Sequence, residues 1–77
     1  MALITDATTT WSTPVTLTND EVWQTRKGSL FVSTTASPDA EDGLALQENH
    51  AVLFSAGSNV RYRKEGITEA VLVREVV

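Results

Sequence analysis

His50 is the only histidine in the chain, so it is the first residue to consider for acid-base chemistry. A hydrolytic triad needs a nucleophile, a base and an orienting group in mutual contact. Serines are present, but none lies in a Gly-x-Ser-x-Gly turn, and no residue close to His50 in sequence completes such a set. We therefore interpret His50 as a turn or strand-edge residue and predict that the protein is not an enzyme.

The densest group of carboxylates is a short segment with Asp39, Glu41 and Asp42 before Gly43. Calcium prefers several hard oxygen ligands in a tight loop, and acidic residues before a glycine resemble half of such a loop. The full pattern requires a glutamate six residues after the glycine, where this chain has Asn49. Cysteine is absent, so the single histidine and the carboxylates are the remaining candidate ligands. The sequence predicts a solvated acidic loop, with no metal and no cofactor.

Two arginines, Arg61 and Arg63, flank Tyr62, an arrangement also found on nucleic-acid-binding surfaces. However, the chain has ten acidic and six basic side chains, for a formal net charge of −4. Affinity for nucleic acid comes mainly from Lys and Arg on phosphates, so we predict no nucleic-acid binding. We expect Arg61 and Arg63 to form ion pairs and hydrogen bonds, mostly at a subunit contact. Their candidate partners are Glu65, Glu69 and Glu75.

Residues that favour strands are abundant: the chain has nine Val, two Ile and eleven Thr. Such β-branched side chains are stiff and pack well on a pleated surface. Segments 21–26 and 29–35, joined by Lys27-Gly28, are predicted to form a β-hairpin. Residues 51–54 are apolar on both faces, which predicts a strand buried on both sides. In residues 60–64, Val60 and Tyr62 form one face and the two arginines the other.

These segments predict an all-β fold, a small barrel or jelly-roll-like sandwich of about seven short antiparallel strands. Residues 1–14 are predicted to form a flexible or partner-docked N-terminal arm, and residues 15–77 a single β domain. No apolar run reaches the roughly 20 residues needed to cross a bilayer, so we expect no membrane partner.

The length of 77 residues favours self-association, because a lone core of this size is marginally stable. Residues 70–77 form a final apolar strand whose edge would be either exposed or covered by a neighbour. Trp11, within a Thr-rich segment, is a natural anchor on another subunit. We expect a homo-oligomer and favour a threefold arrangement. The predicted interface residues are Trp11, Arg61, Arg63, Val76 and Val77.

Several short motifs resemble small β-rich structural proteins of tailed phages, prophages and gene transfer agents. The resemblance covers residues 11–75 and consists of turn-and-strand patterns. It implies a compact β module that is present in several copies on a virion, and it carries no site residues with it. The motifs are Trp11, residues 21–28, residues 32–35, Pro38, Asp42-Gly43, residues 54–57 and residues 60–63.

The sequence therefore favours a virion or virion-like structural component that associates with itself and docks on a larger virion protein. The expected location is the virion, assembled in the bacterial cytoplasm. The alternative is a carbohydrate- or host-surface-binding β module that uses Trp11, Trp23 or Tyr62. The two differ in one property: a binding module needs exposed aromatic side chains beside polar residues in a concave patch, whereas an assembly component is expected to bury its aromatics and arginine pairs between chains.

Overall fold

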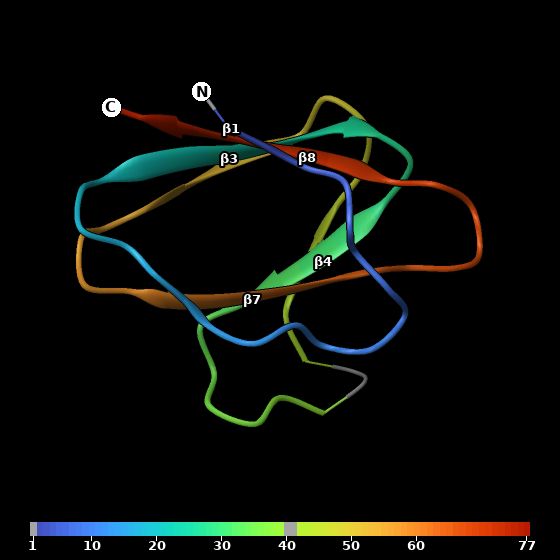
Figure 1. Cartoon of the computed structure of the whole chain (residues 1–77), viewed down its shortest axis with the longest axis horizontal. Coiled ribbons are helices and arrows are strands. Elements are labelled where there is room, and N and C mark those ends of the chain that lie inside the picture. The colour runs from blue at the N-terminus through green and yellow to red at the C-terminus, as the bar shows by residue number, and fades with distance from the viewer. Residues whose placement is uncertain (1, 40–41) are drawn as a thin grey trace.

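The computed structural model describes residues 2–39 and 42–77, which form eight strands in two packed sheets (Figure 1). No helix occurs among these residues, and the sheets do not close into a barrel. The prediction of an all-β, sandwich-like fold is therefore confirmed. The strands are β1 (Ala2–Ile4), β2 (Val15–Thr16), β3 (Glu21–Lys27), β4 (Leu30–Ser33), β5 (Leu44–Leu46), β6 (Ala51–Phe54), β7 (Asn59–Lys64) and β8 (Val71–Val76).

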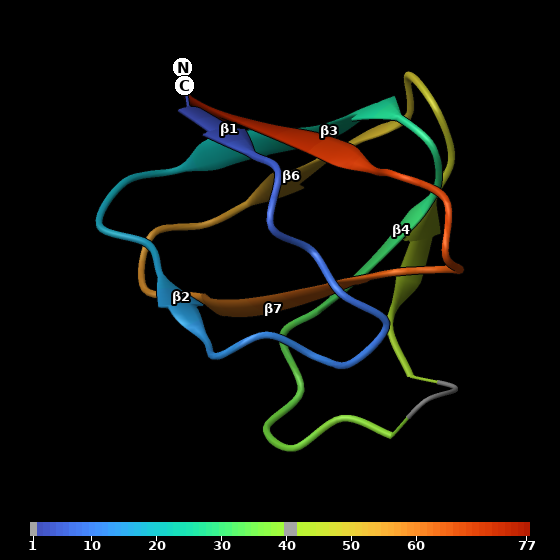
Figure 2. The same cartoon turned by 45° about the vertical axis from the view of Figure 1, so that its right-hand side comes forward.

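Every strand pair in both sheets is antiparallel. The first sheet has the order β1-β8-β3-β6, and the second has the order β2-β7-β4-β5. Figure 2 shows the two sheets as separate layers, with β1, β3 and β6 in one and β2, β4 and β7 in the other. Each layer has an inner face towards the core and an outer face directed away from it.

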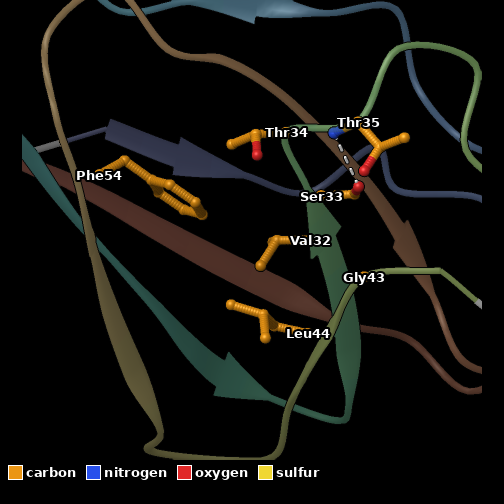
Figure 3. A pocket seen from close by; sticks show the side chains of 7 residues that line it. All are labelled: Val32, Ser33, Thr34, Thr35, Gly43, Leu44 and Phe54. Atoms are coloured by element: carbon orange, nitrogen blue, oxygen red, sulfur yellow. Dashed lines mark hydrogen bonds between the residues drawn. The ribbon is translucent and has the colours of Figure 1, made fainter.

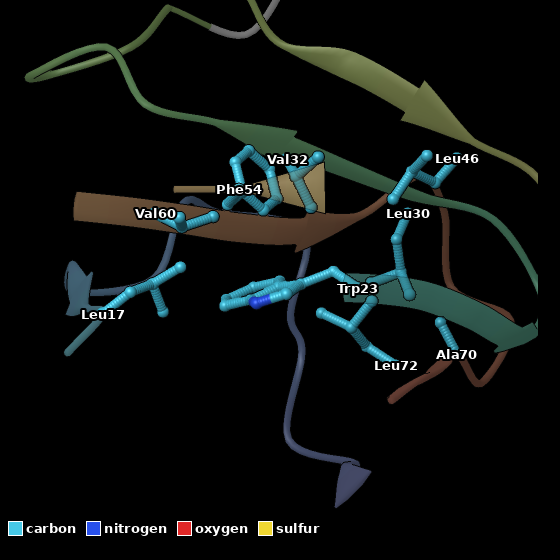
Figure 4. Close-up of a cluster of buried hydrophobic side chains, with 9 residues drawn as sticks. All are labelled: Leu17, Trp23, Leu30, Val32, Leu46, Phe54, Val60, Ala70 and Leu72. Carbon is cyan, nitrogen blue, oxygen red and sulfur yellow. The ribbon is translucent and has the colours of Figure 1, made fainter. Parts of the chain in front are cut away.

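The core lies between the layers and is organised around Trp23, whose side chain is 0% exposed (Figure 4). Its ring contacts Phe54 edge-on, with centroids 5.5 Å apart and planes at 79°. Tyr62 lies on the other layer with its ring centroid 6.3 Å from that of Trp23. Alternation along β7 directs Val60 and Tyr62 inwards, as predicted. The buried cluster comprises Leu17, Trp23, Leu30, Val32, Leu46, Phe54, Val60, Ala70 and Leu72.

The predicted hairpin between residues 21–26 and 29–35 is wrong, because β3 and β4 belong to different sheets. β3 pairs with β6 and β8, whereas β4 pairs with β5 and β7. A register shift between Thr25 and Lys27 and a positive φ of 72° at Gly28 turn the chain from one layer to the other. Both strands then bury their apolar side chains in the same core from opposite sides.

The N-terminal segment packs on strands of its own chain. β1 pairs with β8, the Lys64 amide donates to the Thr8 carbonyl at 2.8 Å, and the Ser12 amide donates to the Tyr62 carbonyl at 2.9 Å. The segment predicted as a flexible or partner-docked arm thus contacts both layers. The edge of the last strand, expected to be exposed or covered by a neighbour, is instead paired at residues 72–74 with β1 of the same chain, so β8 lies between β1 and β3.

Candidate functional site

The residues considered for catalysis and metal binding lie apart. His50 is exposed at the end of a turn, where its amide donates to the Gln47 carbonyl at 2.9 Å. In the acidic loop, the Asp39 amide donates to Asp42 Oδ2 at 2.8 Å, and Glu41 lies outside the described residues. Within residues 2–39 and 42–77, no three side chains of the metal-ligating types gather around a common point.

Three of the predicted interface residues meet on the outer face of the second sheet. The Arg63 guanidinium lies 5.3 Å from the Trp11 ring centroid and 4.3 Å from that of Phe31. Trp11 Nε1 donates to the Asp39 carbonyl at 2.9 Å, and Arg61 Nη1 donates to the Ser12 carbonyl at 3.2 Å. A cation between aromatic rings is stabilised by their quadrupoles. Contacts within the chain therefore cover this outer face with Trp11, Arg63 and Phe31.

The other two predicted interface residues, Val76 and Val77, lie at the end of the first sheet. Both side chains are exposed, and the Val77 amide donates to the Asp20 carbonyl at 3.0 Å. Val76 lies opposite Glu21 in the strand register. Val76 and Val77 are therefore separate from the group around Trp11, and the five predicted interface residues are divided between the two sheets.

A partly buried ion pair at the same end of the first sheet was not predicted from the sequence. Arg74 Nε donates to Glu21 Oε1 at 2.9 Å, and Arg74 Nη2 donates to Glu21 Oε2 at 3.0 Å. Trp23 Nε1 also donates to Glu21 Oε1, at 3.1 Å, and the guanidinium lies 5.2 Å from the Trp23 ring centroid. Alternation from Trp23 places Glu21 on the inner face, which is the one sequence signal for this group.

The outer face of the first sheet is largely apolar, and no other strand of the described residues packs over it. Leu3 on β1 and Leu53 on β6 are 58% and 63% exposed. Between them, Val73 is only 5% exposed and does not belong to the core cluster; in the register it lies between Leu3 and Gln24. In both cartoon views no strand lies over this sheet (Figures 1 and 2). We define the outer apolar face as Leu3, Val22, Ala51, Leu53, Val71 and Val73.

This finding corrects the prediction for residues 51–54, which were expected to be buried on both sides. Phe54 and Val52 pack towards the core, whereas Leu53 faces away from it and is exposed. β6 is the edge strand of its sheet, and no third layer lies against it. The residue pattern is that of a strand covered on both faces, but the chain covers only one of them.

A cavity of about 360 Å³ opens at one end of the sandwich (Figure 3). The Ser33 hydroxyl accepts a hydrogen bond from the Thr35 amide at 3.0 Å. Among the described residues, those that line the cavity include no histidine and no carboxylate. The lining residues are Val32, Ser33, Thr34, Thr35, Gly43, Leu44 and Phe54.

Tyr62 is the only tyrosine, and its hydroxyl donates to Asp6 Oδ1 at 2.9 Å. Burial raises the pKa of Tyr62 above its usual value of 10.0, and the Asp6 hydrogen bond and charge raise it further, while Arg74 lowers it. The unfolded chain therefore loses this proton first as the pH rises. The stability that depends on the neutral phenol is complete below pH 10.0 and is lost as the pH passes the higher folded-state pKa.

We expect the tyrosinate absorbance of the native protein to titrate above the value for the urea-unfolded chain. Asp6→Asn should lower the native pKa only in part, because burial is the largest cause and remains. Tyr62→Phe should remove the corresponding loss of stability at alkaline pH. Equal titration midpoints for native and unfolded protein would contradict this assignment.

Comparisons with protein-family models, with curated proteins and with solved structures gave no match. Within the described part of the chain, no helix has the length and hydropathy required to cross a membrane.

Proposed function

We propose that the protein is a structural component of a virion or virion-like particle, assembled in the bacterial cytoplasm. In this role it associates with copies of itself and docks on a larger particle protein. The observation that supports this most strongly is the outer apolar face, where Leu3 and Leu53 are more than half exposed. Contiguous apolar surface rimmed by polar residues is typical of protein interaction sites.

The difference between the two outer faces supports the same proposal. On the second sheet, Trp11 and Arg63 lie over the strands and are held by contacts within the chain. On the first sheet, the outward side chains are mostly apolar, among them Leu3, Val22 and Leu53, and neither cartoon view shows a strand over them. Two sheets also form a small core in a chain of 77 residues, so burial of further apolar surface would stabilise it.

The alternative, a carbohydrate- or host-surface-binding module, depends on exposed aromatic side chains. Trp23 is fully buried, Trp11 lies against Arg63, and the Tyr62 hydroxyl is bonded to Asp6. Contacts within the chain thus engage all three side chains, whereas a binding module of this kind needs them exposed. The geometry therefore weighs against ligand binding by these residues.

The proposal is tested by quantitative mass spectrometry of particles purified from the source organism. We expect the protein in those particles at a fixed ratio to the major structural protein, retained through density-gradient purification. A protein of the same abundance that is known to be outside particles provides the control for carry-over. Absence of the chain from particles of full composition would contradict the proposed function.

A further inference from the structure

We propose that two copies of this chain pack face to face through the outer apolar face, with their strands antiparallel about a twofold axis. The inference deepens the proposed function, on which it rests, by naming the surface, the partner and the symmetry of self-association. It differs in symmetry from the threefold arrangement favoured by the sequence. Two features carry it: the order of residues on the face and the charges at its two ends.

The strand register arranges the face in rows that cross the sheet. The central row contains Leu3, Val73, Gln24 and Ala51 side by side on β1, β8, β3 and β6. The row on one side of it contains Glu75, Val22 and Leu53. The row on the other side contains Val71 and Lys27. Apart from Gln24, the centre of the face is thus apolar; one end carries Glu75, and the other carries Lys27, which is ion-paired with Glu69.

These end charges select the orientation of the second copy. An axis along the central row places Glu75 of each copy over the row that contains Lys27 of the other. This arrangement therefore places two pairs of opposite charges near each other, Glu75 of each copy with Lys27 of the other. An axis parallel to the strands would bring the two Glu75 side chains together, and the two Lys27 side chains likewise. The Lys27–Glu69 ion pair, at 3.4 Å between exposed side chains, is weak enough to leave Lys27 available.

The axis also places residues of the central row near their own copies. Val73 and Leu3 then lie against apolar side chains of the same kind. The Gln24 amide donates one hydrogen bond to the Asn49 carbonyl at 3.2 Å. It keeps a second N–H and its oxygen, with which two copies can bond reciprocally. In this contact the apolar side chains of the central row face one another, and the polar Gln24 amide faces a hydrogen-bonding partner.

The size of the face limits the interface that two copies can form. Strands lie about 4.8 Å apart and advance about 3.3 Å per residue, so four short strands present a face roughly 15–20 Å on a side. Two such faces bury roughly 450–800 Å², which is smaller than the usual specific interface and typical of weak association. We therefore expect a weak, reversible dimer that forms only at high protein concentration and that dilution separates.

The first test is sedimentation equilibrium of the full chain from low micromolar to several hundred micromolar. We expect a monomer–dimer equilibrium whose dissociation constant rises about tenfold or more in Leu53→Glu. Ile67→Glu is the matched control, because Ile67 is 95% exposed in the loop between β7 and β8 and lies outside the face. Circular dichroism confirms that each variant is folded. Equal effects of the two variants would overturn the proposed face.

The second test distinguishes the orientations by exchanging charges. Glu75→Lys and Lys27→Glu should each weaken self-association, because each puts like charges together in the antiparallel dimer. Combining both changes in one chain, or mixing the two single variants, should restore it. If each single variant associates like the wild type, the antiparallel orientation is wrong.

The outcomes separate this inference from the proposed function. A strict monomer over the whole range overturns self-docking, and so does a trimer that is insensitive to Leu53→Glu. Either result leaves the particle measurement unaffected. Conversely, a dimer with the expected charge dependence supports the inference even if the chain is absent from particles, in which case the proposed function fails alone.

Discussion

Replacing Trp23 with alanine is expected to remove most of the stability of this domain. The side chain is fully buried, contacts Phe54 edge-on and lies within the cluster shared by both sheets. Truncating a buried tryptophan costs about 3–5 kcal/mol, through lost transfer free energy and the cavity that remains. Domains of this size have a total stability of roughly 4–12 kcal/mol, so the loss is a large fraction of it.

Urea denaturation followed by far-ultraviolet circular dichroism measures this effect directly. Trp11→Ala is the matched control, because Trp11 is only half-buried and lies outside the core cluster. We expect Trp11→Ala to reduce the free energy of unfolding by less than half as much. A smaller loss for Trp23→Ala than for Trp11→Ala would mean that the core is organised around different residues.

The strand content and the direction of side chains follow from the sequence because they are local properties. Alternation along residues 60–64 correctly placed Val60 and Tyr62 inwards and both arginines outwards. Stiff β-branched residues separated by turn residues correctly indicated an all-β fold. These features depend on residues close together in the chain, so a periodic pattern is sufficient to detect them.

Strand pairing was not predictable in the same way, because it depends on residues far apart. The link at Lys27-Gly28 is suitable for a hairpin, but each flanking strand forms its hydrogen bonds with strands from the second half of the chain. β1 is only three residues long and pairs with β8 near the other end of the sequence. A strand that short has no detectable period, so the sequence predicts residues 2–4 as part of the N-terminal arm of residues 1–14.

The candidate site could be predicted only in part, because some of its contacts also depend on residues far apart in the chain. Trp11, Arg61 and Arg63 do meet on one sheet face, yet the stacking of Trp11 on Arg63 depends on the path of the N-terminal segment over β7. Partners among Glu65, Glu69 and Glu75 were expected for the arginines, whereas Arg61 donates to a carbonyl. The exposure of Leu53 was missed because apolar residues on both faces of a strand normally indicate two covering layers.

Breaking the Glu21–Arg74 pair is expected to have the second large effect. The two side chains are 7% and 25% exposed, and both guanidinium–carboxylate bonds are near 3.0 Å. Removing one partner of a buried pair leaves an uncompensated charge, at a cost of about 3–5 kcal/mol. Arg74→Met should fall at the lower end of that range, because water reaches part of the guanidinium and can also reach the carboxylate left behind.

The conservative variant Arg74→Lys tests geometry separately from charge. An ammonium group cannot form both parallel bonds to the carboxylate, so we expect Arg74→Lys to lose a substantial part of the stability despite the retained charge. Lys27→Met, which breaks the exposed pair with Glu69, is the control and should cost less than about 1 kcal/mol.

A double-mutant cycle with Glu21→Gln then determines whether the two residues act as a unit. Glu21→Gln in an Arg74→Met background should be much less destabilising than in the wild type, because the carboxylate has already lost its partner. The glutamine oxygen can still accept the bond that Trp23 Nε1 donates, so the remaining cost measures only the loss of charge from that acceptor. Additive free energies of unfolding would show that the pair stabilises nothing beyond its packing. The end of the first sheet would then be held by Trp23 and the β1–β8 pairing instead.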